Sequence, residues 1–164
     1  MQVTIMRLLC VLLIVGGFYS VSFSQLTSSE VESMSKNADL IITGKVMQQS
    51  SDWDETKTRI YTHATIQVEE YLKGSNTGSS IVVSYPGGEV GDIGELYSHT
   101  PKFENNEEVL VFLKKDKTGA SYKVVNGEEG KFTVISDAKT GEKVTTSNVQ
   151  INSLKAQIKS YIND

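Results

Sequence analysis

The side chains that could do chemistry gather in one glycine-rich stretch, residues 86–107. Its residues 89–99 carry three carboxylates, a phenol and an imidazole, at Glu89, Asp92, Glu95, Tyr97 and His99. Such a set could supply a general acid and base, or oxygen ligands for calcium. However, the spacing of the carboxylates does not follow the calcium-loop pattern D-x-[DN]-x-[DN]-G, and no neighbouring motif fixes their positions. We therefore expect solvated loop charges here, with no catalytic residue and no metal site.

Other catalytic and cofactor patterns are missing from the sequence as well. The two histidines, His63 and His99, cannot supply the four ligands of a structural zinc site, because the only cysteine is Cys10 near the N-terminus. No G-x-S-x-G motif marks a nucleophile. The stretch PGGEVGDIG matches neither a phosphate-binding loop nor a dinucleotide fingerprint, and its acidic residues would repel phosphate. The sequence therefore predicts a protein that is not an enzyme and binds no cofactor.

Alternating apolar and polar residues predict the sheet that positions this stretch. Residues 38–49 alternate as in a half-buried strand, and Gly44 interrupts the apolar row, which indicates a bulge or a bend. Residues 59–72 alternate over a length unusual for a small sheet, so we expect this strand to coil as barrel strands do. The polar residues 48–57 are expected to connect the two strands.

Shorter strands and two terminal helices complete the prediction. The strands are expected at residues 81–85, 108–115, 122–125 and 131–136, with a second hairpin around residues 137–143. Residues 27–37 predict a short helix, since Ser29 and Glu32 have capping-box spacing. Residues 149–162 have apolar side chains near helical spacing, which predicts an amphipathic helix capped by Asn148.

These elements indicate a mainly β protein. Five or six strands, of which the first two are long, favour a small closed or partly open barrel with a short N-terminal helix and a C-terminal amphipathic helix. We expect an oligonucleotide/oligosaccharide-binding-like (OB-like) barrel, and an immunoglobulin-like sandwich is the alternative. Residues 25–164 are expected to form a single domain, which is long enough to bury a core without disulfides.

The order and spacing of several motifs resemble the netrin-like module. They are ADLIITGKV, a long strand that ends in VEEYLKG, then IVVSYPGG, and later EEVLVFLKK with YKVV, and together they span residues 38–135. The chain is similar to the N-terminal domain of the tissue inhibitors of metalloproteinases, and to small exported prokaryotic domains of that type. The resemblance implies an OB-like barrel that is exported and engages another protein.

One departure from this resemblance concerns mechanism. In those inhibitors the mature chain begins with a cysteine whose amino and carbonyl groups bind the protease zinc, and disulfides fix that edge. Here the expected mature chain begins at Gln25 and contains no cysteine. The resemblance therefore implies no inhibition by that mechanism, and no site residue is carried over.

The N-terminus predicts export. Arg7 and the apolar residues 8–19 precede Ser22 and Ser24, a small-x-small cleavage pattern, so a signal peptide is expected over residues 1–24. The apolar run is too short for a transmembrane anchor. The net charge of −4 becomes −5 without Arg7, which argues against binding to nucleic acid. We expect a secreted, periplasmic or cell-surface protein with no membrane span after cleavage.

Together these observations predict an exported, non-enzymatic binding module that contacts another exported protein through the region of residues 86–103. The residues expected to bind this partner are the exposed aromatic rings and glycines in and beside that region: Trp53, Gly87, Gly88, Tyr97, His99 and Phe103. Two alternatives stay open. One is a metal-binding or hydrolytic protein that uses the loop carboxylates and His99, and the other is a structural component of the cell envelope.

Overall fold

Two long strands, β1 (Leu40–Trp53) and β2 (Ile60–Lys73), begin the sheet in the computed structural model, which describes residues 27–117 and 119–163. They pair antiparallel, and shifts of register interrupt β1. One shift falls at Gly44, where an added Cβ would overlap a carbonyl oxygen of β2. Only glycine fits so close an approach, and the bulge predicted at this position is confirmed.

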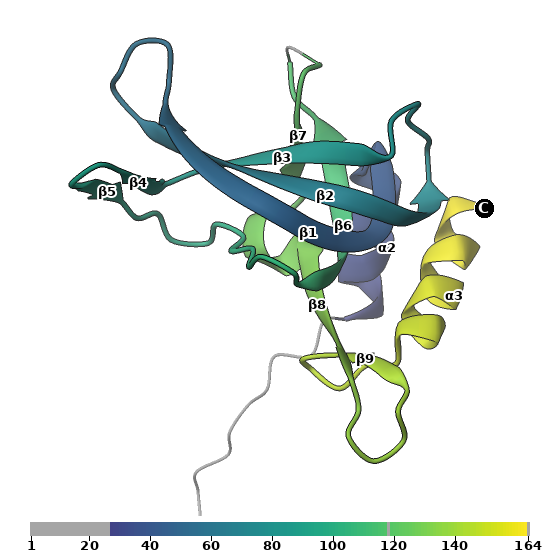
Figure 1. The fold of residues 1–164 in the computed structure, drawn as a ribbon. Helices are drawn as coiled ribbons and strands as arrows, with labels where there is room; N and C mark the ends of the chain where they lie inside the picture. Colours follow the sequence, from purple (N-terminus) through teal and green to yellow (C-terminus); the bar gives the residue numbers. More distant parts are fainter. Residues whose placement is uncertain (1–26, 118, 164) are drawn as a thin grey trace, which may run out of the picture.

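Three further strands close the barrel: β3 (Ser80–Pro86), β6 (Glu108–Lys115) and β7 (Tyr122–Val124). β3 pairs with β2, and β6 pairs with the first part of β1. β7 lies between β3 and β6 and runs parallel to β3. The order β1-β2-β3-β7-β6 thus returns to β1, and the sheet closes on itself (Figure 1). This is a closed five-stranded barrel of the OB-like kind, so the predicted fold class is confirmed and the sandwich alternative is wrong.

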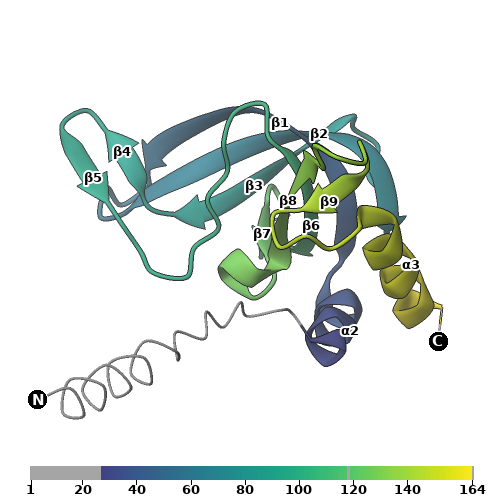
Figure 2. The same cartoon turned by 90° about the horizontal axis from the view of Figure 1, so that it is seen from below.

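The remaining elements lie outside the closed barrel: β8 (Lys131–Ser136), β9 (Lys143–Thr145), the short 3-10 helix η1 (Gly127–Gly130), α2 (Ser28–Asn37) and α3 (Ile151–Ile162). β8 pairs with β6 and forms the predicted second hairpin with β9. The two α-helices lie at one end of the molecule, beside the first part of β1 (Figure 2).

Buried apolar side chains form two layers on either side of the sheet. The interior of the barrel is filled by alternate residues of its strands: Leu40, Ile42, Val46, Ala64, Ile66, Ile81, Val83, Val109, Val111 and Leu113, together with Phe103 from the connection before β6. The second layer joins the outer face of β1, β2 and β6 to the helices: Val31, Met34, Ala38, Ile41, Leu72, Leu110, Phe112, Leu154 and Ile158. Both faces of β6 are therefore buried, which explains its continuous apolar sequence.

Two segments that the sequence predicted to be irregular connections contain strand residues. Residues 48–53 were expected to be a polar connection, but they belong to β1 and pair with β2 up to Trp53. The stretch of residues 86–107 contains a hairpin of β4 (Gly88–Val90) and β5 (Ile93–Glu95). A two-residue turn joins these strands, and its Gly91 has a φ of +61°, which suits a tight hairpin turn.

The helix starts also differ from the prediction. The capping box of α2 is formed by Thr27 and Glu30, not by Ser29 and Glu32. At the other end, Asn148 does not cap α3, because the helix begins later, after Gln150. Asn148 instead has a φ of +63° in the turn before the helix.

The predicted signal peptide, residues 1–24, lies outside the described residues, and so does Cys10. Within residues 27–117 and 119–163, neither helix has the length and apolar character needed to cross a membrane.

Candidate partner-binding surface

A cleft of about 800 Å³ lies where β1 runs beyond its pairing with β6. One wall consists of side chains from β1, β2 and β3, and the other consists of the β4–β5 hairpin and the segment after it, up to Glu104. The hairpin projects at the end of the molecule opposite α3 (Figures 1 and 2). Four of the residues predicted to bind a partner, Gly87, Gly88, Tyr97 and Phe103, therefore line a cleft at one end of the barrel.

A chain of hydrogen bonds fixes the root of the hairpin to the barrel. The hydroxyls of Ser51 and Thr62 lie 2.9 Å apart on neighbouring strands. Thr62, which is buried, donates its hydroxyl proton to the carbonyl oxygen of Gly87 at 2.7 Å. The amide of Gly87 donates in turn to the carbonyl oxygen of Ile60 at 2.8 Å. Both polar groups of the Gly87 backbone are thus bonded to β2.

The backbone conformation and close contacts of Gly88 explain why a second glycine follows Gly87 at the root of the hairpin. Its φ is +129°, a conformation that residues with side chains rarely adopt. A Cβ at this position would overlap the hydroxyls of Ser51 and Thr62. The glycine therefore lets the hairpin backbone lie directly on the two strands.

Glu95 makes a second attachment on the other strand of the hairpin. Its Oε2 accepts a hydrogen bond from the amide of Ile60 at 3.1 Å and another from the hydroxyl of Tyr97 at 2.9 Å. The bond to the Glu95 carboxylate raises the pKa of Tyr97, because a negative neighbour disfavours the phenolate. Glu95 is consequently a structural anchor of the hairpin rather than a free acid.

The segment that leads back into the barrel is held by Gln49 of β1. The side-chain Nε2 of Gln49 donates to the carbonyl oxygen of Phe103 at 2.7 Å, and its Oε1 accepts from the hydroxyl of Tyr85 at 2.8 Å. The rings of Tyr85 and Phe103 have centroids 5.7 Å apart. Burial raises the pKa of Tyr85. These contacts close the base of the cleft.

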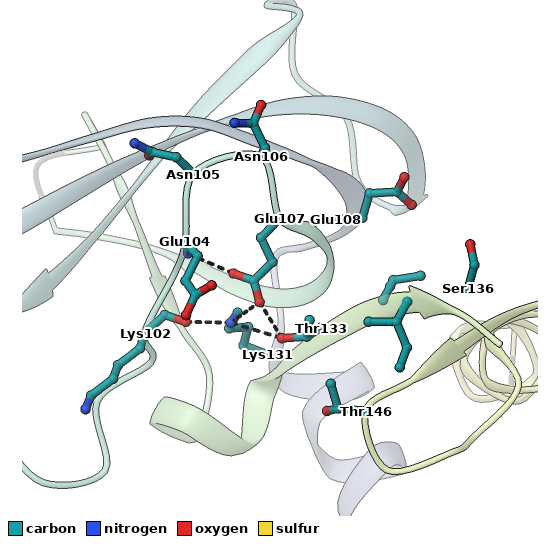
Figure 3. A pocket seen from close by; sticks show the side chains of 12 residues that line it. Lys102, Glu104, Asn105, Asn106, Glu107, Glu108, Lys131, Thr133, Ser136 and Thr146 are labelled. Carbon is teal, nitrogen blue, oxygen red and sulfur yellow. Dashed lines mark hydrogen bonds and ion pairs between the residues drawn. The ribbon is translucent and has the colours of Figure 1, made fainter. Parts of the chain in front are cut away.

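A second pocket, of about 660 Å³, lies beside this returning segment (Figure 3). At its base the ammonium of Lys131 lies 2.6 Å from Glu107, 2.5 Å from the carbonyl oxygen of Lys102 and 3.2 Å from the hydroxyl of Thr133. The side chains of Lys131 and Glu107 are only 11% and 10% exposed. Because these two charges neutralise each other, the ion pair fixes the returning segment and leaves little charge at the base of the pocket to bind a ligand.

The hairpin and the residue that follows it, Leu96, expose two apolar side chains, and Leu96 also lines the cleft. Ile93 is 54% exposed and Leu96 is 85% exposed. The carboxylates of Glu89 and Asp92 are exposed next to them, and residues 87–97 contain no lysine or arginine. This surface, Glu89, Asp92, Ile93, Gly94 and Leu96, is called the hairpin surface below.

The structure brings some of the predicted binding residues together and separates others. Four of them line the cleft: Gly87, Gly88, Tyr97 and Phe103. The two glycines lie where the hairpin is attached to the strands. Phe103 is only 5% exposed and belongs to the barrel core, so it has almost no surface to offer a partner.

Trp53 and His99 do not line the cleft. Trp53 is half-buried at the end of β1, where it pairs with Ile60. His99 is exposed, has a φ of +58°, and places Nδ1 3.3 Å from a carboxylate oxygen of Glu128. Its neighbour is therefore the turn at η1, not the carboxylates of the hairpin.

This arrangement does not assemble the loop carboxylates and His99 into a metal site. Glu95 points to Ile60 and Tyr97, while His99 points to Glu128. Within the described residues, no group of three or more histidine, cysteine, aspartate or glutamate side chains is placed to hold a metal ion.

Reasoning from sequence missed Ile93, Leu96 and the polar anchors Gln49, Ser51 and Thr62. The sequence V-G-D-I, with a glycine and an aspartate between two β-branched residues, was a usable hairpin signal. For the anchors no such signal exists, since their hydrogen-bond partners lie at least 11 residues away along the chain.

No protein-family model matches the chain, and no curated protein shows significant similarity to it.

Proposed function

We propose that the protein is an exported, non-enzymatic binding module of the netrin-like type, which binds another exported protein through the hairpin surface. The observation that carries the proposal is the exposure of Ile93 and Leu96, at 54% and 85%, on a hairpin fixed to the barrel. A single exposed apolar side chain needs no explanation. Ile93 and Leu96 lie three residues apart on one anchored projection, which supports an interaction site there.

The energetics favour a protein partner. Fully burying a leucine or isoleucine side chain contributes about 1.5–3 kcal/mol relative to leaving it exposed. The hydrogen bond from Thr62 to Gly87 and the one from the Ile60 amide to Glu95 already hold the hairpin in place, so binding would not have to order it. A contact that needs little ordering retains more of its interaction free energy as affinity.

The netrin-like assignment is supported by the order of the motifs and is compatible with the closed five-stranded barrel. The absence of cysteine beyond Cys10 argues against the zinc-binding N-terminus of the metalloproteinase inhibitors. A module of this kind would therefore bind through the end of the barrel that carries the hairpin.

The test is capture of a partner from the exported proteins of the source organism, with identification by mass spectrometry. Three proteins are compared: the wild type, a variant with both Ile93→Ser and Leu96→Ser, and the control Ile135→Ser. Ile135 is 46% exposed on β8, outside the hairpin surface. We expect one partner to be captured by the wild type and the control, and to be lost with the double variant.

Two results would contradict the proposal. Equal capture by all three folded proteins would place the contact elsewhere on the molecule. No capture by the folded wild type would favour a structural role in the envelope instead.

A further inference from the structure

Strand β5 is an edge strand, paired with β4 on one side only. The two-stranded sheet of β4 and β5 contains no third strand within the described residues. Its register pairs Val90 with Ile93, Glu89 with Gly94 and Gly88 with Glu95. Gly94 therefore lies at the middle of the three-residue edge, and it is exposed.

The register also determines which backbone groups face outward. Opposite residues of an antiparallel pair alternate between hydrogen-bonded and non-hydrogen-bonded pairs. A two-residue turn makes the residues next to it, Val90 and Ile93, a bonded pair, so Glu89 and Gly94 form the next, non-bonded pair. The amide and carbonyl of Gly94 consequently point away from β4. They offer one donor and one acceptor to an added strand.

Two other strands have features that protect an edge. The outer side of β9 is covered by the bridge between Val144 and Gln150, and the amide of Thr145 donates to the carbonyl oxygen of Val149 at 2.8 Å. β3 ends at Pro86, which has no amide hydrogen to offer. By contrast, β5 carries neither of the two residues that commonly guard an edge, proline and lysine.

The charges beside β5 define the chemistry of the strand that would fit. The Cγ of Glu89 lies 3.4 Å from the position of a Cβ on Gly94, so the glutamate side chain lies across the glycine. A residue opposite Gly94 on an added strand would therefore lie close to this carboxylate, and Asp92 stands at the turn. A lysine or arginine at that position would be favoured, with an apolar neighbour against Ile93.

A second copy of this protein fits this edge poorly. Antiparallel pairing of two β5 strands would bring Glu89, Asp92 and Glu95 of both copies together. Like charges directly opposite each other destabilise a strand pair. The edge is also only three residues long, which is too short to hold two barrels together against that repulsion.

We infer that β5 accepts an extended segment of the partner protein as an added strand, and that this segment alternates basic and apolar residues. The inference rests on the proposed function and specifies its mode of binding. Backbone hydrogen bonds to Gly94 supply part of the affinity, and pairing with Glu89 and Asp92 selects the segment.

The test uses the wild-type protein and two synthetic peptides, Lys-Val-Lys-Val-Lys-Val and Glu-Val-Glu-Val-Glu-Val, with acetylated and amidated ends. Binding is followed by NMR shifts and by hydrogen exchange of the Gly94 amide. We expect the basic peptide to bind and to slow exchange at Gly94, and the acidic peptide not to bind. Failure of the basic peptide to bind, or binding without protection of Gly94, would overturn the inference.

Two variants at Gly94 separate backbone pairing from other contacts. Gly94 does not have a positive φ, and a Cβ there meets nothing closer than 3.4 Å, so Gly94→Ala should fold as the wild type does and keep the outward amide. Gly94→Pro removes the outward amide but no bond to β4, and should weaken binding of the basic peptide about tenfold. Shifts of the Val90 and Ile93 amides report whether the hairpin persists in the proline variant. Equal binding by both variants would contradict strand addition.

The same variants distinguish this inference from the proposed function. A partner captured through Leu96 and Ile93 but bound equally well by Gly94→Pro would leave the binding module standing and exclude strand addition. Loss of that partner with Gly94→Pro, but not with Gly94→Ala, would support both.

Discussion

The two ends of this molecule are held together by different interactions. At the end covered by α2 and α3, fully buried apolar side chains such as Phe112, Met34 and Ile158 join the helices to the sheet. At the other end, the β4–β5 hairpin is attached by hydrogen bonds from Thr62 and by the carboxylate of Glu95.

This difference matters for function. An element attached through its apolar side chains has few of them left for a partner. The hairpin is attached through its backbone and one carboxylate, so Ile93 and Leu96 stay exposed. The helix end thus adds a buried apolar layer that stabilises the fold, while the hairpin end supplies a surface of fixed shape.

The largest expected effect is at the helix end. Phe112 is 0% exposed, and its ring centroid lies 6.0 Å from that of Phe132. Replacing it with alanine should lower the free energy of unfolding by about 3–5 kcal/mol, because it leaves a cavity in a packed layer. Chemical denaturation followed by circular dichroism measures this loss.

The matched control is Ile93→Ala at the hairpin end, which should change the free energy of unfolding by less than about 0.5 kcal/mol. A loss at Ile93 similar to that at Phe112 would show that the hairpin surface is part of the core in solution, and the contrast between the two ends would fail.

A smaller effect is expected at the root of the hairpin. Gly88→Ala forces a side chain into a conformation with φ near +129° and against the hydroxyls of Ser51 and Thr62. We expect a loss of about 1–3 kcal/mol in the free energy of unfolding. NMR shifts of the hairpin amides should change, while those of α3 stay as in the wild type. Gly94→Ala is the control on the same hairpin, and a similar loss there would refute a specific role for Gly88.

The sequence predicted the two ends unequally, for a physical reason. Apolar and polar residues alternate regularly in the barrel strands, and β6 has a continuous apolar run. The apolar residues of these strands face one of the two buried layers. The hairpin shows no such pattern, since most of its side chains are not buried and its attachments are made by backbone atoms and the carboxylate of Glu95. Its glycines indicated turns but not the strands to which they are attached.

Two errors illustrate the limits of local patterns. Thr27 and Ser29 both have a glutamate three residues later, so two overlapping capping boxes were available, and only tertiary packing selects the first. Phe103 was predicted at a binding surface from its place in a long connection. It is buried because the segment folds back over the open end of the barrel, onto Tyr85, and this path leaves no trace in the local sequence.

The smallest expected effect is a change in titration at the hairpin root. Tyr97 donates its hydroxyl proton to Glu95, and this bond raises the pKa of the phenol above its ordinary value of about 10. The stabilising contribution of the bond is therefore fully present below pH 10 and is lost as the pH rises through the higher pKa of the folded protein. Glu95→Gln should lower the pKa of Tyr97, as followed by NMR of its ring carbons. Glu89→Gln, on the same hairpin, should leave it unchanged. An identical titration of Tyr97 in the wild type and Glu95→Gln would mean that the bond does not persist in solution. The attachment of the hairpin would then depend on Thr62, the two glycines and the hydrogen bond from the Ile60 amide to Glu95.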